Sequence, residues 1–338
     1  MSPVPPATAT GSLEVSIVIG TLDRCDILER AIRSILDQDC APSRYEIVVV
    51  DNGSKDRTRA VVEEICATAS NVRYVVEPKL GLSNARNKGI AEARCDVVGF
   101  FDDDGTADPG WLNTMLEVFR KEPDAGAVGG LIKVGWPAEQ PHWMPMSLQG
   151  YYAGCDYGPE RRYLRFPDYP YGPNMMIRKS LLNAIGGFRD AVGPKGQNSM
   201  SAGEQDLFQR LYEHPIKVIY EPSAVVHHWV PASRATRKWL LKRAYRHGFS
   251  NTRMVHTRAN ATRLTWVRRL IQSASKSAIA AVAGSLAYLG RRPAPIVTSR
   301  IANMMYWAGI ARGSLDGVIR GAVLTSSPGS GRGELSAS

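Results

Sequence analysis

The stretch VVGFFDDDG, residues 97–105, decides how this chain folds. Five largely apolar residues are typical of a buried β-strand, and three adjacent aspartates follow them directly. Two carboxylates 4 Å apart repel each other by roughly 4 kcal/mol at an effective dielectric of 20, so a partner or bulk water must offset the charge. Aspartate is common in turns, which makes a solvated turn the simpler interpretation of the triplet alone. The rest of the chain has to decide between a turn and a site.

The segments before this stretch alternate between strand and helix patterns. Short apolar runs predict strands, and apolar residues at helical spacing predict helices between them. The expected strands are 15–19, 46–50, 72–76 and 96–101, and the expected helices are 26–37, 58–67 and 82–93. This order predicts parallel βαβ units in a sheet that helices cover on both faces. Ligands bind such sheets at the carboxyl ends of the strands, where the segments 21–23, 51–54 and 102–104 then meet.

The second half of the chain contains an irregular aromatic segment between further strands and helices. We expect helices at 109–119, 179–185 and 204–213, and strands at 127–134 and 216–220. The aromatic side chains of residues 135–174 either stack on sugar rings or pack as a cap over the sheet. They are Trp136, Trp143, Tyr151, Tyr152, Tyr157, Tyr163, Tyr169 and Tyr171. Beyond a boundary near Val230 the chain is predicted to be helical.

The composition is that of a soluble globular protein, with 44% hydrophobic and 22% charged residues. Five scattered cysteines without a CxxC spacing indicate neither a disulfide framework nor a zinc cluster, and they fit a cytoplasmic location. Residues 1–12 and 326–338 are predicted to be disordered. No secretory signal and no membrane-spanning run is expected.

The net charge of +10 is concentrated in the C-terminal part, where residues 234–320 contain 17 Lys or Arg and one acid. The segment 265–290 has an amphipathic pattern. Its expected apolar arc is Trp266, Val267, Leu270, Ile271, Ala274, Ala278 and Val282, with Arg268, Arg269 and Lys276 opposite. We therefore expect 231–325 to be a basic amphipathic helical region that contacts an anionic membrane surface peripherally. Packing on the rest of the chain and packing in a homodimer are open alternatives, and no nucleic-acid partner is expected because no known binding module accompanies the charge.

Polar segments after the expected strands are candidates for nucleotide binding. No GxGxxG or GxxxxGK[ST] pattern occurs, which disfavours a dinucleotide or P-loop site. Asp51 ends the second strand and can accept hydrogen bonds from a base or ribose, although DNGS also suits a plain turn. The segment GLSNARNKGI, residues 81–90, places donors at a helix N-terminus, where they suit either a phosphate or an ordinary cap.

Acids and a histidine in the second half are candidates for metal binding and proton transfer. Imidazole together with aspartate oxygens suits Mn²⁺, and less distinctively Mg²⁺, so His228 is a candidate ligand, although a lone histidine is more often structural. Such a cation would offset the repulsion within the aspartate triplet. Glu204 and Asp206 stand at a helix entry, where acids also simply complement the helix dipole. The preceding residues 193–203 are long enough to form a lid.

Six motifs in order identify a family. SIVIGTLDR, EIVVVDNGSKDRT, GLSNARNKGI, FFDDDG, GPNMMIRKSLLNAIGGF and GEQDLFQRL together resemble the inverting family 2 glycosyltransferases with the GT-A fold. The resemblance covers about residues 13–255. It implies an α/β fold, a Rossmann-like, mostly parallel sheet flanked by helices, with a helical C-terminal extension. The GT-A domain would span 13–230, with a nucleotide-binding half at 13–105 and an acceptor half at 106–230.

The resemblance also implies roles for nucleotide-binding residues. Thr21 and Asp23 match the loop that contacts the nucleoside, and Asp51 matches an aspartate that reads the base. Arg86 matches the arginine of the family's ARN, near the base and the diphosphate. Asp102 matches the first acid of the DxD motif, on the ribose side. Asp103 has the weakest claim in this set.

The same resemblance assigns metal binding and catalysis to residues from both halves of the expected GT-A domain. Asp104 matches the metal ligand of the DxD motif, and His228 matches a C-terminal histidine that can complete the metal shell. Glu204 matches the catalytic base, with Asp206 as second choice, because GEQDL has one acid fewer than the family's E-D-x-D-L. Gly20 also departs from the family, which usually has proline there.

The implied activity is transfer of a sugar from a nucleoside-diphosphate sugar, of UDP type, to an acceptor hydroxyl, with Mn²⁺ or Mg²⁺ and with inversion. The acceptor would be a carbohydrate or a lipid-linked glycan in glycan, glycolipid or polysaccharide synthesis, and the enzyme would act in the cytoplasm or on the cytoplasmic membrane face. Two alternatives stay open: a degenerate nucleotide-binding domain without activity, and a sugar nucleotidyltransferase. The latter should have a Gly-rich phosphate loop after the first strand, which GTLDRCD lacks.

Overall fold

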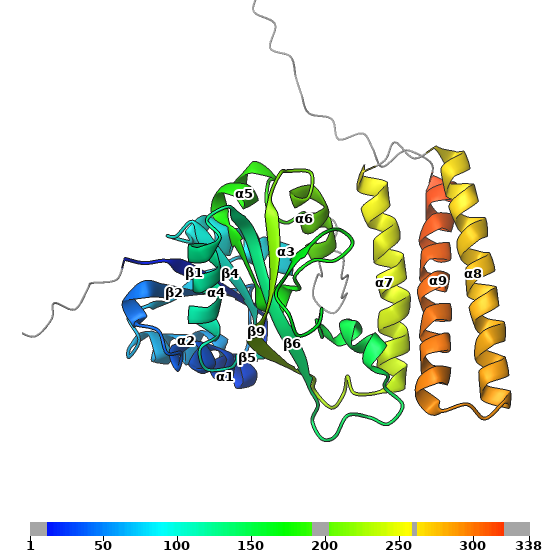
Figure 1. The fold of residues 1–338 in the computed structure, drawn as a ribbon, viewed down its shortest axis with the longest axis horizontal. Helices are drawn as coiled ribbons and strands as arrows, with labels where there is room; N and C mark the ends of the chain where they lie inside the picture. Colours follow the sequence, from blue (N-terminus) through cyan, green and yellow to red (C-terminus); the bar gives the residue numbers. More distant parts are fainter. Residues whose placement is uncertain (1–11, 191–202, 259–261, 321–338) are drawn as a thin grey trace, which may run out of the picture.

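The structure is a computed structural model that describes residues 12–190, 203–258 and 262–320 (Figure 1). The predicted disordered ends and the predicted lid lie almost wholly outside these residues. The strands are β1 Val15–Thr21, β2 Tyr45–Asp51, β3 Val72–Val76, β4 Val97–Asp102, β5 Gly105–Ala107, β6 Ala125–Gly135, β7 Arg162–Leu164, β8 Met175–Arg178 and β9 Lys217–Trp229. The helices are α1 Cys25–Leu36, α2 Thr58–Cys66, α3 Leu82–Glu92, α4 Trp111–Lys121, α5 Lys179–Ala184, α6 Gly203–Leu211, α7 Arg237–Arg258, α8 Arg263–Leu289 and α9 Ala294–Arg320, with short 3₁₀ helices at Pro42–Arg44, Met146–Tyr152 and Gly172–Asn174.

One mixed sheet contains all of these strands, in the order β3-β2-β1-β4-β8-β6-β9-β5, with β7 on β9. The strands β3, β2, β1 and β4 are parallel, as the βαβ pattern predicts. The expected α/β fold class is confirmed, and the sheet beyond β4 is mixed, because β8 runs antiparallel to both β4 and β6. β5 and β7 likewise run antiparallel to β9, while β6 and β9 are parallel.

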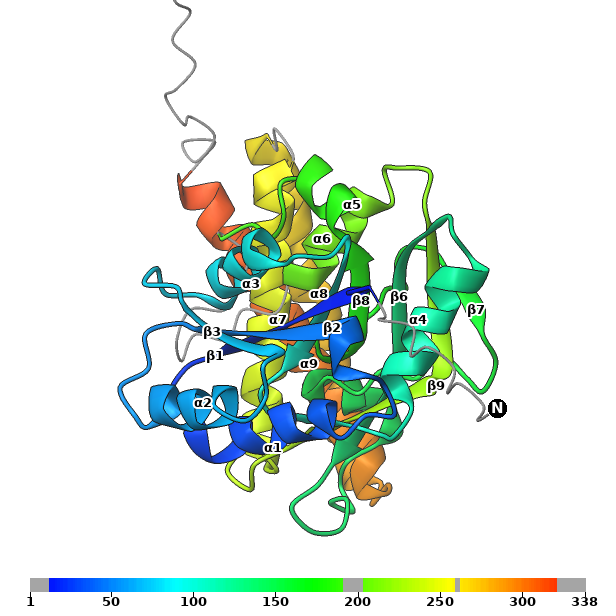
Figure 2. The same ribbon diagram turned by 90° about the vertical axis from the view of Figure 1, so that its left-hand side faces the viewer.

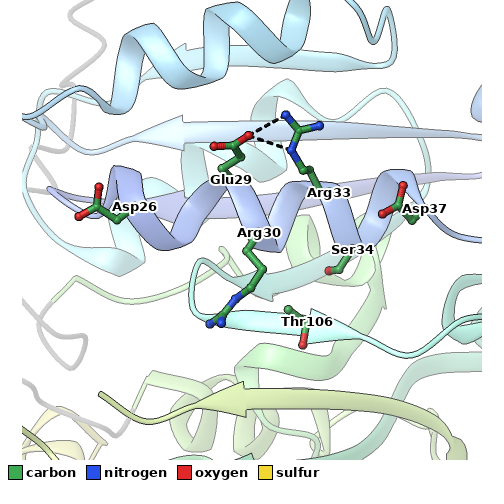
Figure 3. A pocket seen from close by; sticks show the side chains of 7 residues that line it. All are labelled: Asp26, Glu29, Arg30, Arg33, Ser34, Asp37 and Thr106. Carbon is green, nitrogen blue, oxygen red and sulfur yellow. Dashed lines mark hydrogen bonds and ion pairs between the residues drawn. The ribbon is translucent and has the colours of Figure 1, made fainter. Parts of the chain in front are cut away.

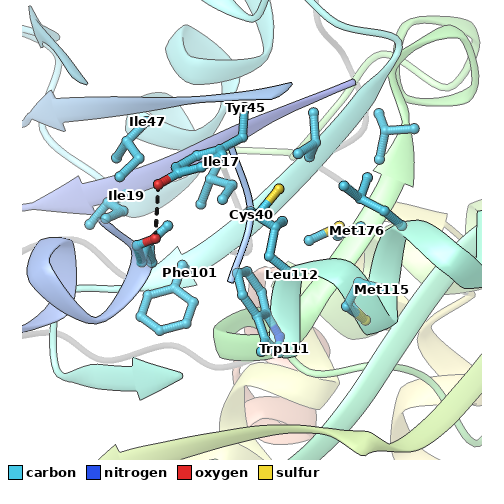
Figure 4. Packing of buried hydrophobic residues seen from close by; sticks show 14 of the residues in the cluster. Ile17, Ile19, Cys40, Tyr45, Ile47, Phe101, Trp111, Leu112, Met115 and Met176 are labelled. Atoms are coloured by element: carbon cyan, nitrogen blue, oxygen red, sulfur yellow. Dashed lines mark hydrogen bonds between the residues drawn. The ribbon is translucent and has the colours of Figure 1, made fainter. Parts of the chain in front are cut away.

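Helices cover both faces of the sheet (Figure 2). On one face, Ile17 and Ile47 pack with apolar residues of α1, α2 and α4 (Figure 4). The hydroxyl of Tyr45 donates a hydrogen bond to the carbonyl of Ile35 in α1, at 3.1 Å, at the side of this cluster. On the other face, Val18 packs with apolar residues of α3, α5 and α6. Because side chains alternate between the two faces of a strand, apolar burial on both sides explains the continuous apolar runs.

The three C-terminal helices stand beside the sheet domain, with α7 nearest to it and α9 between α7 and α8 (Figure 1). Glycines let α7 and α9 approach closely: a Cβ at Gly248 would collide with the carbonyl of Tyr306, and one at Gly309 with the carbonyl of Tyr245. Among the residues that the structure describes, no helix has both the length and the apolar character needed to cross a membrane.

The residues of the apolar arc expected on α8 are divided between a buried and an exposed face. Trp266 is buried, but the rest of the buried face consists of small residues, Ser273, Ala280, Gly284 and Ala287. The larger apolar side chains form a separate stripe that is between 60 and 75% exposed: Ile271, Ile279, Val282, Leu286 and Leu289. Small side chains allow α9 to pack closely, so the bulky ones point away from the helix pair.

Candidate active site

The aspartate triplet lies where β4 turns into β5. β4 ends at Asp102, and β5 begins at Gly105 and runs back along β9. In this antiparallel pairing Gly105 lies opposite His228. The backbone NH of Trp229 also donates a hydrogen bond to the carbonyl of Asp104, at 2.9 Å. The pairing therefore brings together two segments that are more than 120 residues apart in sequence.

Asp102, Asp104 and His228 form a cluster that can hold a metal ion. One ligand atom from each residue lies within 4.8 Å of the others. Nε2 of His228 is 3.0 Å from Oδ1 of Asp104, whereas its buried Nδ1 has no hydrogen-bond partner among the described residues. Two carboxylates and an imidazole are a donor set that suits Mn²⁺, so the residues present fit a divalent cation.

Arg24 supplies the positive charge nearest to the triplet. Its guanidinium forms ion pairs with Asp103 and, at 2.7 Å, with Asp104, and the hydroxyl of Thr21 donates to Asp103 at 2.9 Å. Burial raises the pKa of Asp103 to about 7 against the opposing effect of Arg24. For Asp104 burial also favours the neutral acid, but His228 and Arg24 outweigh it and lower the pKa. Asp103 thus faces the loop after β1, and Asp104 faces the metal cluster.

A second buried arginine joins the triplet to α6. Nη1 of Arg86 donates to Oε1 of Glu204 at 2.7 Å, and Nη2 is 3.2 Å from Oδ1 of Asp102. Burial raises the pKa of Glu204, but the neighbouring Arg86 guanidinium outweighs burial, so the net pKa is lowered. Arg86 comes from the first turns of α3, in the segment 81–90 that the sequence marks as a donor site.

Asp206 lies two residues after Glu204 on α6 but in a different environment. Its side chain is fully buried and forms ion pairs with Arg210, at 2.9 Å, and with Arg189, at 3.4 Å. It is not among the residues that line the cleft described below, whereas Glu204 is. Of the two candidate bases, Glu204 therefore faces the cleft, and Asp206 belongs to a buried group of ion pairs.

The loops after β1 and β2 are tied together at the nucleotide side. The backbone NH of Lys55 donates to Oδ1 of Asp23 at 2.6 Å, and the NH of Asp23 donates to the hydroxyl of Ser54 at 2.9 Å. Asp51 accepts hydrogen bonds from the Ser54 NH, at 2.8 Å, and from the Tyr74 hydroxyl, at 2.5 Å. Asp23 lines the cleft, but Asp51 does not, and Asn52 beside it does. Asp51 thus stabilises the turn at 51–54 from the side that faces away from the cleft.

A cleft of about 1380 Å³ connects these groups. It runs from the β1 loop past the aspartates and Glu204 to the helices α7 and α9. The aromatic segment lies partly at the cleft and partly in packed protein: Tyr151, Tyr152, Tyr169 and Tyr171 line the cleft, while Trp136, Trp143 and Tyr152 pack in a small cluster with Val230 and Leu240.

A smaller hollow of about 390 Å³ lies along α1 (Figure 3). Its walls are Asp26, Glu29, Arg30, Arg33, Ser34, Asp37 and Thr106. Glu29 and Arg33 form an exposed ion pair there, at 2.6 Å. The hollow contains none of the residues that the sequence marks for binding or catalysis.

A comparison with known families agrees with the six motifs. The sequence profile described as "Glycosyl transferase family 2" matches residues 16–186, which is half of the chain. The chain belongs to glycosyltransferase family 2. The expected family and the expected enzyme class are confirmed, and the nucleotidyltransferase alternative is set aside.

Individual proteins extend the likeness beyond the matched half. The chain is 29% identical over 241 residues to the glucosyl-dolichyl phosphate glucuronosyltransferase of Haloferax volcanii, covering 70% of this chain and 76% of that protein. It is 26% identical over 289 residues to the succinoglycan biosynthesis protein ExoM of Rhizobium meliloti, covering 82% of this chain and 86% of that protein. In structure it resembles a mannosyltransferase from Pyrobaculum calidifontis, solved with GDP-Man and Mn²⁺, with a TM-score of 0.59, 19% identity, and coverage of 90% and 88% of the two chains. The GT-A fold is confirmed by this likeness.

Several basic side chains of this glycosyltransferase's cleft were not predicted from the sequence. Arg24 follows Asp23 directly in the β1 loop, and its place in the motif was the available signal. Arg243, Arg246 and His247 line the cleft from α7. With Trp239 they recur at helical spacing, which could have marked this face of α7 as one surface.

Proposed function

We propose that this glycosyltransferase transfers a sugar from a nucleoside-diphosphate sugar to an acceptor hydroxyl, with a divalent metal ion and with inversion at the anomeric carbon. The observation that supports it best is the arrangement of the cleft. A cluster fit for Mn²⁺ and an ionised Glu204 line the same cavity, and Arg86 connects them. The mannosyltransferase with the same fold binds GDP-Man and Mn²⁺.

In this proposal the donor occupies the end of the cleft near the β1 loop. Thr21, Asp23 and Asn52 line that end and would contact the nucleoside, with Asp51 holding the 51–54 turn behind them. Asp102 would lie on the ribose side, and Arg86 would lie near the base and the diphosphate. Our first choice of nucleotide is UDP.

Asp104 and His228 would hold Mn²⁺ or Mg²⁺, with Asp102 as a further ligand. When bound, the metal ion supplies Lewis-acid chemistry that neutralises the charge on a leaving diphosphate. Asp103 stays paired with Arg24 and Thr21 and orients the β1 loop.

Glu204 would act as the general base. Its pKa is lowered, so the carboxylate is ionised at neutral pH and can accept the proton of an acceptor hydroxyl. The deprotonated oxygen attacks the anomeric carbon on the face opposite the leaving group, which inverts the configuration. Asp206 is enclosed with Arg210 and Arg189, so we propose a structural role for it instead.

The acceptor is proposed to be a carbohydrate joined to a lipid carrier. The support comes from the Haloferax relative, whose name describes a glucosyl-dolichyl phosphate substrate. The five free cysteines fit a reducing compartment, so we place the reaction on the cytoplasmic face of a membrane.

The exposed stripe on α8 is the surface that we propose contacts the membrane. Ile271, Ile279, Val282, Leu286 and Leu289 recur at helical spacing on the outermost helix (Figure 1). Arg268 on α8 and the pair Arg291 and Arg292 beyond its end are exposed. An apolar stripe accompanied by cations complements an anionic lipid surface.

A screen of nucleotide sugars tests the proposed function. UDP- and GDP-sugars are added with and without Mn²⁺, and the melting temperature is measured. We expect stabilisation by one nucleotide series that depends on Mn²⁺, because a ligand that binds only the folded state raises the melting temperature. NMR of the product then shows whether the anomeric configuration is inverted. Absence of stabilisation by any nucleoside diphosphate would contradict the proposal.

A further inference from the structure

The far end of the cleft, where α7 and α9 close it, contains two arginines and one histidine, and burial lowers the pKa of that histidine, His247, to about 4, so that its ring is neutral. Arg243, Arg246 and His247 line the cleft there from α7. α9 contributes Ser299, Asn303 and Tyr306, which are polar but uncharged. The ring of His247 lies 5.7 Å from the ring of Tyr306 and 5.8 Å from that of Tyr151. The three side chains therefore line the cavity and do not lie on the outer surface of the helix.

Among the described residues at this wall, positive charge exceeds negative charge. Burial lowers the pKa of Arg243, and the nearby Arg234 and Arg246 lower it further, while Glu204 acts in the opposite direction. The carboxylate of Glu204 is already hydrogen-bonded to Arg86. The single acid of residues 234–320 is Asp316, and it pairs with Arg312 on α9. Guanidinium groups held this close together in a cavity favour an anionic ligand.

The two arginines of this wall differ from those that contact the aspartates of the metal cluster. The aspartates of the metal cluster interact with Arg24, Arg86 and Arg234. The acid that acts on Arg243 is Glu204, the proposed base. A ligand group at Arg243 and Arg246 would therefore lie on the acceptor side of the base. Tyr151, whose ring lies 5.8 Å from that of His247, also lines the cleft, and tyrosine rings can pack against a sugar ring.

We propose that Arg243, Arg246 and His247 form a phosphate-binding subsite for the acceptor, so that the acceptor is a glycosyl phosphate or diphosphate. This inference rests on the proposed function, because it assigns Glu204 to the acceptor hydroxyl. Guanidinium forks bind phosphate oxygens in a bidentate manner, and the subsite would orient the sugar so that one hydroxyl reaches Glu204. A lipid-linked sugar phosphate and a soluble sugar phosphate present the same group to it.

Calorimetric titration of the full chain tests the subsite. The probes are glucose 1-phosphate, farnesyl phosphate and, as a neutral ligand, octyl glucoside, each added with and without saturating UDP and Mn²⁺. Arg243→Gln, Arg246→Gln and the double variant are compared with Lys242→Gln, which removes an exposed cation of the same helix outside the cleft. We expect the double variant to bind at least one phosphate probe about tenfold more weakly or worse, and Lys242→Gln to bind it like the original chain.

Arg243→Lys is the conservative variant, and it should recover part of the affinity because it keeps the charge but not the fork. Melting curves show which variants are folded. Tighter binding of farnesyl phosphate than of glucose 1-phosphate indicates a lipid carrier, and the reverse order indicates a soluble acceptor; both support the subsite.

Three results would overturn the inference. The phosphate probes fail to bind the original chain, or they bind the folded double variant equally well, or the double variant loses UDP and Mn²⁺ instead, which would assign the arginines to the donor. Failure of the original chain to bind any nucleoside diphosphate with Mn²⁺ is a separate result, and it contradicts the proposed function.

Discussion

Arg86 donates a hydrogen bond to Glu204 at 2.7 Å while its other terminal nitrogen lies 3.2 Å from Asp102. One buried guanidinium thus connects the proposed base on α6 to Asp102, the last residue of β4. The pair holds Oε1 of Glu204 in place and keeps its pKa low against the effect of burial. The base is therefore positioned and ionised before a substrate arrives, and a defined set of substitutions can separate positioning from proton transfer.

Glu204→Gln should abolish transfer and leave nucleotide binding intact. The amide oxygen of glutamine can still accept the hydrogen bond from Arg86, but the side chain cannot take a proton. We expect kcat to fall by roughly 10²–10⁴-fold, the usual size of a general-base contribution, with an unchanged dissociation constant for UDP and Mn²⁺. Transfer within tenfold of the original rate would remove Glu204 from the role of base.

Asp206→Asn should reduce stability far more than transfer. The substitution leaves the buried guanidinium of Arg210 without its counter-charge, which costs about 3 kcal/mol for a broken buried ion pair. The free energy of unfolding is measured by urea denaturation, and kcat is measured at a temperature where the variant is folded. A variant of unchanged stability that has lost transfer would instead make Asp206 the base.

Gly172→Ala should disturb the Arg86–Glu204 pair although neither of these two residues is substituted. The added Cβ would lie 2.6 Å from Oε1 of Glu204 and even closer to Nη2 of Arg86, so both side chains must shift. A misplacement of about 1 Å can cost up to 10²-fold in rate, so we expect kcat to fall by about tenfold or more.

Gly284→Ala on α8 is the matched control for that variant, because its Cβ would meet its nearest neighbour at an ordinary 3.6 Å. Its transfer rate should equal that of the original chain. If Gly172→Ala also transferred at that rate, the position of the pair would be unimportant for catalysis.

The first half of the fold could be predicted from the sequence because its signals are local. The βαβ units and the strand Val72–Val76 follow from apolar periodicity within short windows. β8 was missed because MMIR is only four residues long and follows an aromatic segment without a crossover helix. β9 was predicted only at its start, because Pro222 interrupts the pattern, but a register shift after Glu221 lets the strand continue to Trp229.

In the candidate site, too, some residues could be predicted from local sequence signals and others could not. Asp102, Asp104 and Glu204 could be found from motifs, whereas the contact between His228 and Asp104 depends on the antiparallel pairing of β5 with β9. The place of α7 at the cleft could not be predicted, because helical spacing marks one face of the helix but does not show which part of the chain that face contacts. The buried face of α8 could not be predicted for a related reason: small residues, not bulky ones, pack against α9.

Metal binding should depend on pH through His228. Burial favours its neutral form, but Asp104 outweighs burial and raises the pKa of His228. A metal ligand must be the neutral imidazole, so protons compete with Mn²⁺ and affinity should fall as the pH decreases through that raised pKa. Titration of Mn²⁺ between pH 8 and pH 6 should show weaker binding at each lower pH.

His228→Asn is the control for this titration, and it should bind Mn²⁺ weakly with little dependence on pH. A pH dependence that persists in this variant would assign the proton to another group. Asp103, whose pKa burial raises to about 7, is the first candidate, and Asp103→Asn would identify it.

The apolar stripe of α8 should bind anionic liposomes. Ile279→Ser together with Leu286→Ser removes two exposed apolar side chains without entering the face that packs on α9. Each buried CH₂ group contributes about 0.8 kcal/mol, so we expect the double variant to partition at least tenfold more weakly in cosedimentation with vesicles that contain phosphatidylglycerol. Val76→Ser, an exposed apolar residue at the end of β3, is the matched control and should bind like the original chain.

Salt and lipid charge separate the two parts of this interaction. Cations near α8 act over a Debye length of about 10 Å at 0.1 M salt, so high salt or neutral vesicles should weaken binding but leave the effect of the serine variant visible. A stripe that instead joins two copies of the chain would show no liposome binding at low salt, together with a dimer in light scattering that the double variant dissociates. That result would replace the membrane surface by a homodimer interface, because the same apolar side chains cannot be buried in both.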